Sequence, residues 1–216
     1  MASRAPEPSA DLFAISPGRG DRDELERKLA RLAEGGLRRF LLREKELAAE
    51  RRGELARRLA PLCRSLGLEL WIAEEAELAA EVGATGVHLS ERSPPPSAIV
   101  ARFGDRLRIG LSIHEELSRP RDELARCGHL FLAPLFPTPS KPAARALGVD
   151  GFACRAAGLP VPTFALGGVG LDHLPLLAAR GVTRVAAIRL FFDADDPRRA
   201  VEEARALLRP PATGLK

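Results

Sequence analysis

Short apolar runs alternate with longer segments of helical periodicity along almost the whole chain, and this alternation limits the fold more than any other feature. Eight runs are candidate strands, at residues 12–16, 39–42, 69–73, 86–89, 108–112, 129–133, 163–166 and 184–188. The intervening and following segments predict helices, at residues 22–35, 47–66, 75–83, 95–103, 115–127, 151–158, 172–181 and 196–208. Such alternation is typical of parallel strands joined by crossover helices.

The number of units favours a closed barrel. Eight βα units in 216 residues suit a single (β/α)8 TIM barrel of the α/β class. The alternative, an open doubly wound sheet, usually stops at about five to seven strands. We expect the barrel over residues 11–209, with a flexible lead-in over residues 1–10 and a tail over residues 210–216. In such a barrel, functional side chains stand at the carboxyl ends of the strands.

Composition excludes several classes of protein. Hydrophobic residues make up 45% of the chain, too many for a disordered protein. The 33 basic residues are interleaved with 29 acidic ones and aromatic residues are few, so we expect no nucleic-acid partner. No apolar run approaches the roughly 18–20 residues that span a bilayer, and the start lacks the apolar core of a signal peptide, so we expect a cytoplasmic protein with no membrane partner.

The three cysteines, Cys63, Cys127 and Cys154, are odd in number and widely spaced. This spacing indicates neither a disulfide framework nor a zinc site. We expect reduced thiols in the core, as in a reducing compartment.

Two basic residues follow the second candidate strand. If the strand continues beyond Leu42, alternation turns Arg43 and Lys45 toward the same side, at the mouth of the barrel. Two cations that converge on a concave site are stabilised by an anion, and a phosphate or pyrophosphate fits them. The other interpretation is that residues 43–46 open the next helix as a solvated face.

Two later loops also suit an anion. Gly167 and Gly168 follow the seventh strand, where barrels commonly bind phosphate through backbone N–H groups, although an ordinary tight turn would have the same sequence. The proline-rich loop after the sixth strand carries Thr138, Ser140 and Lys141, which could hold an oxyanion or could simply be solvated.

Histidines stand in two strands. His114 closes the fifth strand, just after Ser112, and His88 lies in the fourth. A histidine at the mouth of an active site exchanges protons near neutral pH. The other interpretation is that each histidine packs or caps.

Five short sequence motifs, taken in their order along the chain, point to a known family. These motifs are LREK, GVHL, GLSIH, PLFPTPSK and ALGGV. The chain resembles the thiamine phosphate synthase and TenI superfamily from about Leu12 to Leu208. In the synthase branch, the resemblance implies condensation of hydroxymethylpyrimidine pyrophosphate with thiazole phosphate, with Mg2+ on the leaving pyrophosphate.

The resemblance also implies a division of the site residues. The positions that match the family's pyrophosphate-binding residues are Arg43, Lys45 and Lys141, with Ser112 nearby. Those matching the part of the site that binds thiazole phosphate are Thr138, Ser140, the Gly167-Gly168 turn and the end of the eighth strand at Ile188. Arg189, which follows Ile188, and His88 in the fourth strand are further candidates for substrate binding.

Several positions depart from the synthase pattern. Leu41 replaces a glutamine and Ala73-Glu74 replaces Asn-Asp, while Ser93 replaces the second magnesium aspartate. Glu74, or Glu91, is left as a metal ligand if the chain is a synthase that uses Mg2+. Arg189 replaces a small serine and would either clamp the thiazole phosphate or fill its pocket.

The TenI branch fits these losses better, because it keeps the phosphate site without the full metal pair. We therefore expect an enzyme of thiamin biosynthesis that acts on a phosphorylated thiazole, with a TenI-like thiazole tautomerase as the preferred activity. His114 would then transfer the proton, with Ser112 as a second catalytic residue in the same sequence motif. The alternatives are a thiamine phosphate synthase with an altered metal site and a non-catalytic barrel that senses thiazole phosphate or binds a partner. Self-association into a homo-oligomer is left open.

Overall fold

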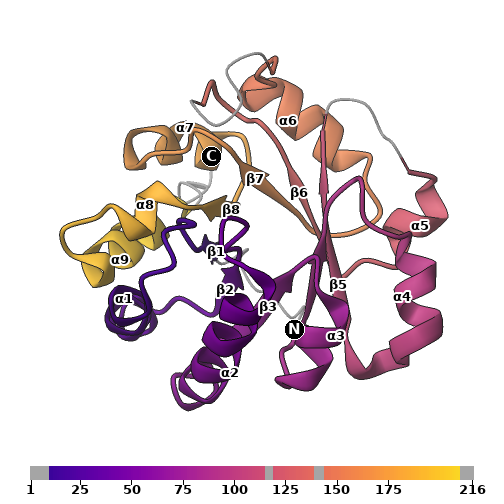
Figure 1. The fold of residues 1–216 in the computed structure, drawn as a ribbon. Coiled ribbons are helices and arrows are strands. Elements are labelled where there is room, and N and C mark those ends of the chain that lie inside the picture. The colour runs from indigo at the N-terminus through magenta and orange to yellow at the C-terminus, as the bar shows by residue number, and fades with distance from the viewer. Residues whose placement is uncertain (1–9, 115–118, 139–143, 210–216) are drawn as a thin grey trace, which may run out of the picture.

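Eight parallel strands close into a barrel in the computed structural model, which describes residues 10–114, 119–138 and 144–209 (Figure 1). The strands are β1 (Asp11–Ile15), β2 (Arg39–Leu42), β3 (Glu69–Ala73), β4 (Gly86–Leu89), β5 (Arg108–Ile113), β6 (His129–Leu132), β7 (Thr163–Leu166) and β8 (Arg184–Ala187). Their order around the barrel follows the chain, and β8 pairs with β1. The TIM barrel is confirmed. The expected tail and all but the last residue of the expected lead-in lie outside the described residues.

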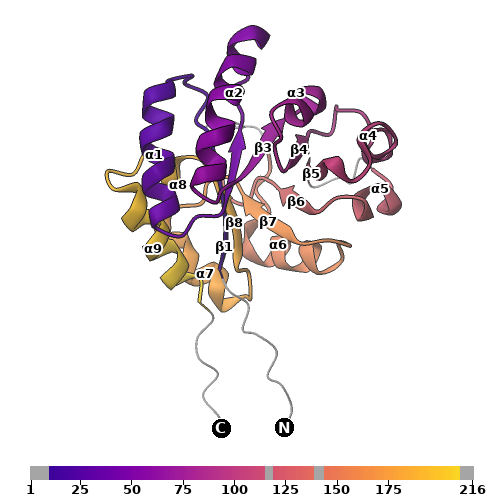
Figure 2. The ribbon, with the colours of Figure 1, turned by 90° about the horizontal axis from the view of Figure 1, so that it is seen from below.

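Helices surround the barrel on its outer face (Figures 1 and 2). They are α1 (Arg22–Glu34), α2 (Ala49–Ser65), α3 (Ala76–Glu81), α4 (Pro96–Phe103), α5 (Arg121–Ala125), α6 (Gly148–Ala157), α7 (Leu174–Ala179), α8 (Arg189–Phe192) and α9 (Pro197–Leu207), with short 3-10 turns at Gly104–Arg106 and Leu171–His173. Side-chain caps start two of them, because Asp21 accepts from the backbone N–H of Glu24 and Asp196 accepts from that of Arg198. Helix α1 lies between α2 and α9 (Figure 2).

One expected helix differs clearly from the structure, one helix was not expected, and the conditional extension of the second strand is absent. Strand β2 ends at Leu42 and does not continue through Lys45. Of the helix expected over residues 115–127, the first four residues lie outside the described chain, and the described part is helical only from Arg121, directly after Pro120. Helix α8 was not predicted, because four residues are too few to show helical periodicity.

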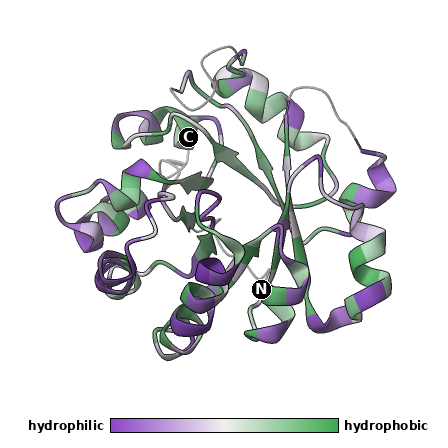
Figure 3. Ribbon diagram, viewed as in Figure 1, coloured by the Kyte–Doolittle hydropathy of each residue, from purple (hydrophilic) through white to green (hydrophobic). Residues whose placement is uncertain are grey.

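Apolar side chains form two layers, one inside the barrel and one between strands and helices. The inner layer is built around Phe13, Trp71, Phe131 and Phe164, each at most 1% exposed. Their rings meet edge to face, with centroids 5.0 Å apart for Phe13 and Phe131. Hydropathy colours show the same division, with apolar strands and polar outer faces on the helices (Figure 3). The barrel interior is therefore solid below the carboxyl ends of the strands.

The cysteines differ from expectation at one position. Cys63 and Cys127 are buried, but Cys154 on α6 is exposed, so the expectation of three core thiols was wrong for Cys154. No helix in the described ranges is both long and apolar enough to cross a membrane.

Candidate functional site

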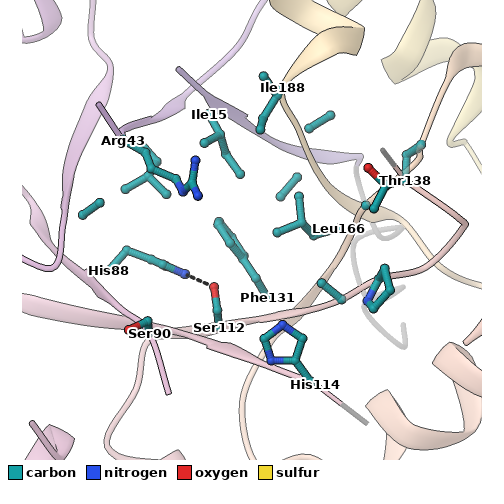
Figure 4. A pocket seen from close by; sticks show the side chains of 18 of the residues that line it. Ile15, Arg43, His88, Ser90, Ser112, His114, Phe131, Thr138, Leu166 and Ile188 are labelled. Atoms are coloured by element: carbon teal, nitrogen blue, oxygen red, sulfur yellow. Dashed lines mark hydrogen bonds between the residues drawn. The ribbon is translucent and has the colours of Figure 1, made fainter. Parts of the chain in front are cut away.

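A pocket of about 490 Å3 opens at the carboxyl ends of the strands, and residues at the end of every strand contribute to it (Figure 4). This volume lies within the range of small-molecule sites. The lining brings together most residues expected from sequence, namely Arg43, Lys45, Glu74, His88, Ser112, His114, Thr138, Gly167, Gly168, Ile188 and Arg189. Ser140 and Lys141, the other two, lie outside the described residues.

The loop after β2 presents alternate residues to opposite sides. Arg43 and Lys45 line the pocket, while Glu44 between them is buried at 2% exposure. The Glu44 carboxylate accepts hydrogen bonds from the backbone N–H groups of Gly18 and Gly20, at 3.1 and 2.7 Å. This buried acceptor ties the loop after β1 to the loop that carries both cations. Helix α2 begins only at Ala49, so residues 43–46 precede it.

Glu74 is the acid that lies with these cations. Its Oε2 is 3.2 Å from Lys45 Nζ, and its backbone adopts a φ of 65°, which non-glycine residues rarely do. Burial favours the neutral carboxyl group, but a hydrogen bond with the Ser90 side chain and the charges of Lys45 and Arg43 outweigh it. Together they lower the pKa of Glu74, so this carboxylate is ionised at neutral pH.

Across the barrel, the loops after β6 and β7 form a second wall. Gly167 and Gly168 have φ values of 101° and 70°, and a Cβ on Gly168 would lie 2.8 Å from the carbonyl oxygen of Pro137. Only glycine permits this backbone and this close approach. Thr138 faces the same side of the pocket, opposite Arg43 (Figure 4).

Arg189 stands at the start of α8, directly after Ile188, and is an exposed residue at the wall of the pocket. Neither the Arg189 guanidinium nor that of Arg43 makes an ion pair or a side-chain hydrogen bond within the described part of the chain. The pocket remains open with Arg189 in its wall. Two arginines that form no ion pair within the described ranges therefore border one cavity, one after β2 and the other after β8.

His114 is held by an acid at the edge of the pocket. Its Nδ1 lies 2.6 Å from Glu91 Oε2, and its backbone N–H donates to the other oxygen of the same carboxylate at 3.2 Å. The contact fixes the ring beside the cavity (Figure 4). Such a pair can share and transfer a proton.

His88 lies deeper and contacts two polar groups. Its Nε2 is 2.9 Å from Ser112 Oγ, and its Nδ1 is 3.1 Å from Nε2 of His129 on β6. Burial, followed by the charges of Arg43 and Lys45, lowers the pKa of His88 to about 3, so the ring is neutral. Sequence reasoning missed His129, although a lone glycine within the fifth strand, Gly110, is a signal of close packing.

The acidic residues around the pocket form no preformed Mg2+ site in the described ranges. Glu74 is engaged by Lys45 and Ser90, and Glu91 is engaged by His114. In the described ranges, no group of three or more His, Cys, Asp or Glu side chains is placed to hold a metal. Since Mg2+ is bound through carboxylate oxygens together with water or phosphate, this donor set offers no preformed site.

Comparison with known proteins was made on sequence and on structure. A family model described as thiamine monophosphate synthase matches residues 12–191. The chain is 35% identical over 204 residues to the thiamine-phosphate synthase of Bordetella avium, covering 91% of this chain and 94% of that protein. It is also 35% identical over 204 residues to the thiamine-phosphate synthase of Thermobifida fusca, covering 93% of each. The thiamine phosphate pyrophosphorylase from Pyrococcus furiosus shares the fold, with a TM-score of 0.75 at 24% identity over 92% of this chain and 95% of that one.

Proposed function

The chain belongs to the thiamine monophosphate synthase family, and on this basis we propose that it joins hydroxymethylpyrimidine pyrophosphate to thiazole phosphate. This transferase was the alternative to the tautomerase preferred from sequence. The relatives named thiamine-phosphate synthase support it more than they support the tautomerase.

The observation that carries the proposal is the presence of two separate cationic walls in one pocket. Arg43 and Lys45 form the wall beside β2, while Arg189 and the Gly167-Gly168 turn form the wall beside β7 and β8. A condensation of two phosphorylated substrates needs two anion sites, whereas isomerisation of one phosphorylated thiazole needs only one. Arginines in two different walls therefore favour the two-substrate reaction.

The chemistry required of the pocket is displacement of pyrophosphate. The bond between the pyrimidine methylene carbon and the pyrophosphate oxygen breaks, and the oxygen leaves with the electron pair. The thiazole ring nitrogen supplies its lone pair to form the new carbon–nitrogen bond. Arg43 and Lys45 would stabilise the charge that develops on the departing oxygen, and Arg189 would hold the thiazole phosphate so that its ring nitrogen faces the methylene carbon.

No step is assigned to a metal, because the described residues form no preformed site for one. The cationic side chains then provide the countercharge that the leaving group requires. A synthase of this kind should keep part of its activity when divalent ions are removed.

The direct experiment incubates the purified chain with both substrates, once with Mg2+ and once with a chelator, and measures thiamine phosphate by fluorescence after oxidation. We expect product in both, with Arg43→Gln strongly impaired and Arg199→Gln, on the exposed face of α9, unchanged. Absence of product at every metal concentration contradicts the proposal.

The contact between His114 and Glu91 favours a second candidate, the thiazole tautomerase. A histidine 2.6 Å from a carboxylate at the pocket edge is suited to move a proton between ring positions. Replacement of His114 by Asn should then abolish isomerisation of thiazole carboxylate phosphate and leave its binding nearly intact. The synthase reaction, in contrast, should tolerate this change. A wild-type chain that binds thiazole phosphate but turns over neither substrate set would indicate the non-catalytic barrel.

A further inference from the structure

Three polar side chains form a continuous line from the pocket into the centre of the barrel. Ser112 and His88 both line the pocket, with Ser112 Oγ 2.9 Å from His88 Nε2 (Figure 4). His129 Nε2 lies 3.1 Å from Nδ1 of His88. Both histidines are 4% exposed. Polar groups of this kind are uncommon in the aromatic interior of a barrel, and nothing in the chemistry proposed above uses His129.

Gly110 makes this line sterically possible. It pairs with His88 in the β4–β5 register and with His129 in the β5–β6 register, so the three residues lie at one level of the sheet. A Cβ at this position would lie 2.4 Å from His129 Nε2 and 2.5 Å from His88 Nδ1. The two rings can therefore meet only because no side chain stands between them.

Both rings are neutral. Burial dominates in each case and lowers the pKa of His88 to about 3. It also lowers the pKa of His129 well below its ordinary value, with smaller contributions from His88, Arg39 and Arg108. A neutral imidazole carries one N–H donor and one bare acceptor nitrogen.

One choice of proton position therefore fixes both hydrogen bonds. If His129 Nε2 donates to His88 Nδ1, then His88 Nε2 carries its own proton and donates to Ser112 Oγ. The Ser112 hydroxyl keeps its hydrogen to donate into the pocket. In the opposite arrangement Ser112 donates inward to His88, and only its lone pairs face the pocket.

We propose that His129 and His88 are positioning residues that hold the Ser112 hydroxyl as a hydrogen-bond donor to the pyrophosphate group of the bound substrate. The inference rests on the proposed function, since it takes pyrophosphate as the anion beside Arg43 and Lys45. An anion accepts hydrogen bonds and donates none, so its binding favours the arrangement in which Ser112 donates outward. His129 acts only through His88 and Ser112.

A double-mutant cycle on the binding of inorganic pyrophosphate tests the relay. Phe at position 129 suits its neighbours, because His129 packs against Phe13 and Trp71 with ring centroids 5.1 and 4.5 Å away. Calorimetry on the full chain should show Ser112→Ala weakening the affinity about ten-fold to a hundred-fold, as expected for a hydrogen bond to a charged group. His129→Phe should weaken it in the same direction. The double variant should be no weaker than Ser112→Ala alone.

A conservative variant separates positioning from packing. His129→Gln keeps a donor that can reach His88 Nδ1, so it should retain most of the affinity that His129→Phe loses. Nitrogen NMR of the labelled ring provides a second readout, in which His88 should carry its proton on Nε2 when pyrophosphate is bound.

The proposed positioning of Ser112 by the two histidines is contradicted if the losses of pyrophosphate affinity are additive in the double-mutant cycle, or if His129→Phe leaves this affinity unchanged. It is also contradicted if His88 carries its proton on Nδ1 in the complex, or if the wild-type chain does not bind pyrophosphate. A wild-type chain that binds pyrophosphate with the expected cycle but forms no thiamine phosphate contradicts the proposed function alone.

Discussion

The buried carboxylate of Glu44 accepts a 2.7 Å hydrogen bond from the backbone N–H of Gly20, twenty-four residues earlier in the chain. A second bond from Gly18 uses its other oxygen. The acid that separates Arg43 from Lys45 in sequence thus turns away from the pocket and fixes the loop beside it. The cationic wall and the loop after β1 are held as one unit.

Replacement of Glu44 by Gln should destabilise the fold by about 1–3 kcal/mol, because the amide group replaces one buried acceptor oxygen with a donor that faces a backbone N–H. Urea unfolding measures this free energy. Glu46→Gln is the matched control, since Glu46 is exposed in the same loop and should change stability little. Equal stability of the two variants would show that the bonds from Gly18 and Gly20 contribute nothing net.

Replacement of Arg189 by Gln should raise the KM for thiazole phosphate about ten-fold or more and leave the KM for the pyrimidine substrate nearly unchanged. Arg43→Gln should have the reverse effect, because the two side chains stand in different walls of the pocket. Steady-state kinetics with each substrate varied in turn provides the measurement. A lower KM for thiazole phosphate in Arg189→Gln would instead mean that the guanidinium obstructs the phosphate.

Stability should fall as the pH decreases below about 6.5. The pKa of His88 is about 3 in the folded chain against 6.5 in its ordinary state, so the unfolded chain binds more protons across this interval. The stabilisation from the neutral ring is fully present above about pH 6.5 and is lost progressively toward pH 3. The pKa of His129 is lowered in the same direction.

Urea unfolding at about pH 7.5, 6 and 5 tests this dependence, with a slope of up to about 1.4 kcal/mol per pH unit for each buried histidine. The variant His129→Phe removes one of the two groups and should show a shallower slope. If both chains lose stability equally, His129 does not contribute to the pH dependence.

Of the three thiols, Cys154 should react rapidly with a thiol reagent under native conditions, because it alone among them is exposed. Burial raises the pKa of Cys63 and Cys127 to about 12, which leaves almost no thiolate at neutral pH. Titration should therefore find one fast thiol in the native chain and three after denaturation. Cys154→Ser should abolish the fast phase, and a fast phase that survives this change would mean that a buried thiol opens to solvent.

The barrel could be predicted from sequence because the apolar runs are short and regularly spaced. Both ends were predicted without error for the four strands β2, β3, β4 and β7. Helix α8 could not be predicted, since a single turn shows no periodicity, and α5 starts late because Pro120 precedes it.

The pocket was predicted in outline, since the segments that follow the barrel strands all lie at the same end of the barrel. The buried hydrogen-bond partners behind the pocket residues were not predicted. Glu44 is an ordinary charged residue in a basic stretch, and only the folded loop shows that it is buried. His129 is a strand residue whose neighbour His88 is 41 positions away, so their contact depends on strand register and on the absence of a side chain at Gly110.

The aromatic layer formed by Phe13, Trp71, Phe131 and Phe164 closes the barrel beneath the pocket. No molecule can therefore pass through the barrel, and every molecule that reaches the floor of the pocket must enter and leave through its mouth at the carboxyl ends of the strands.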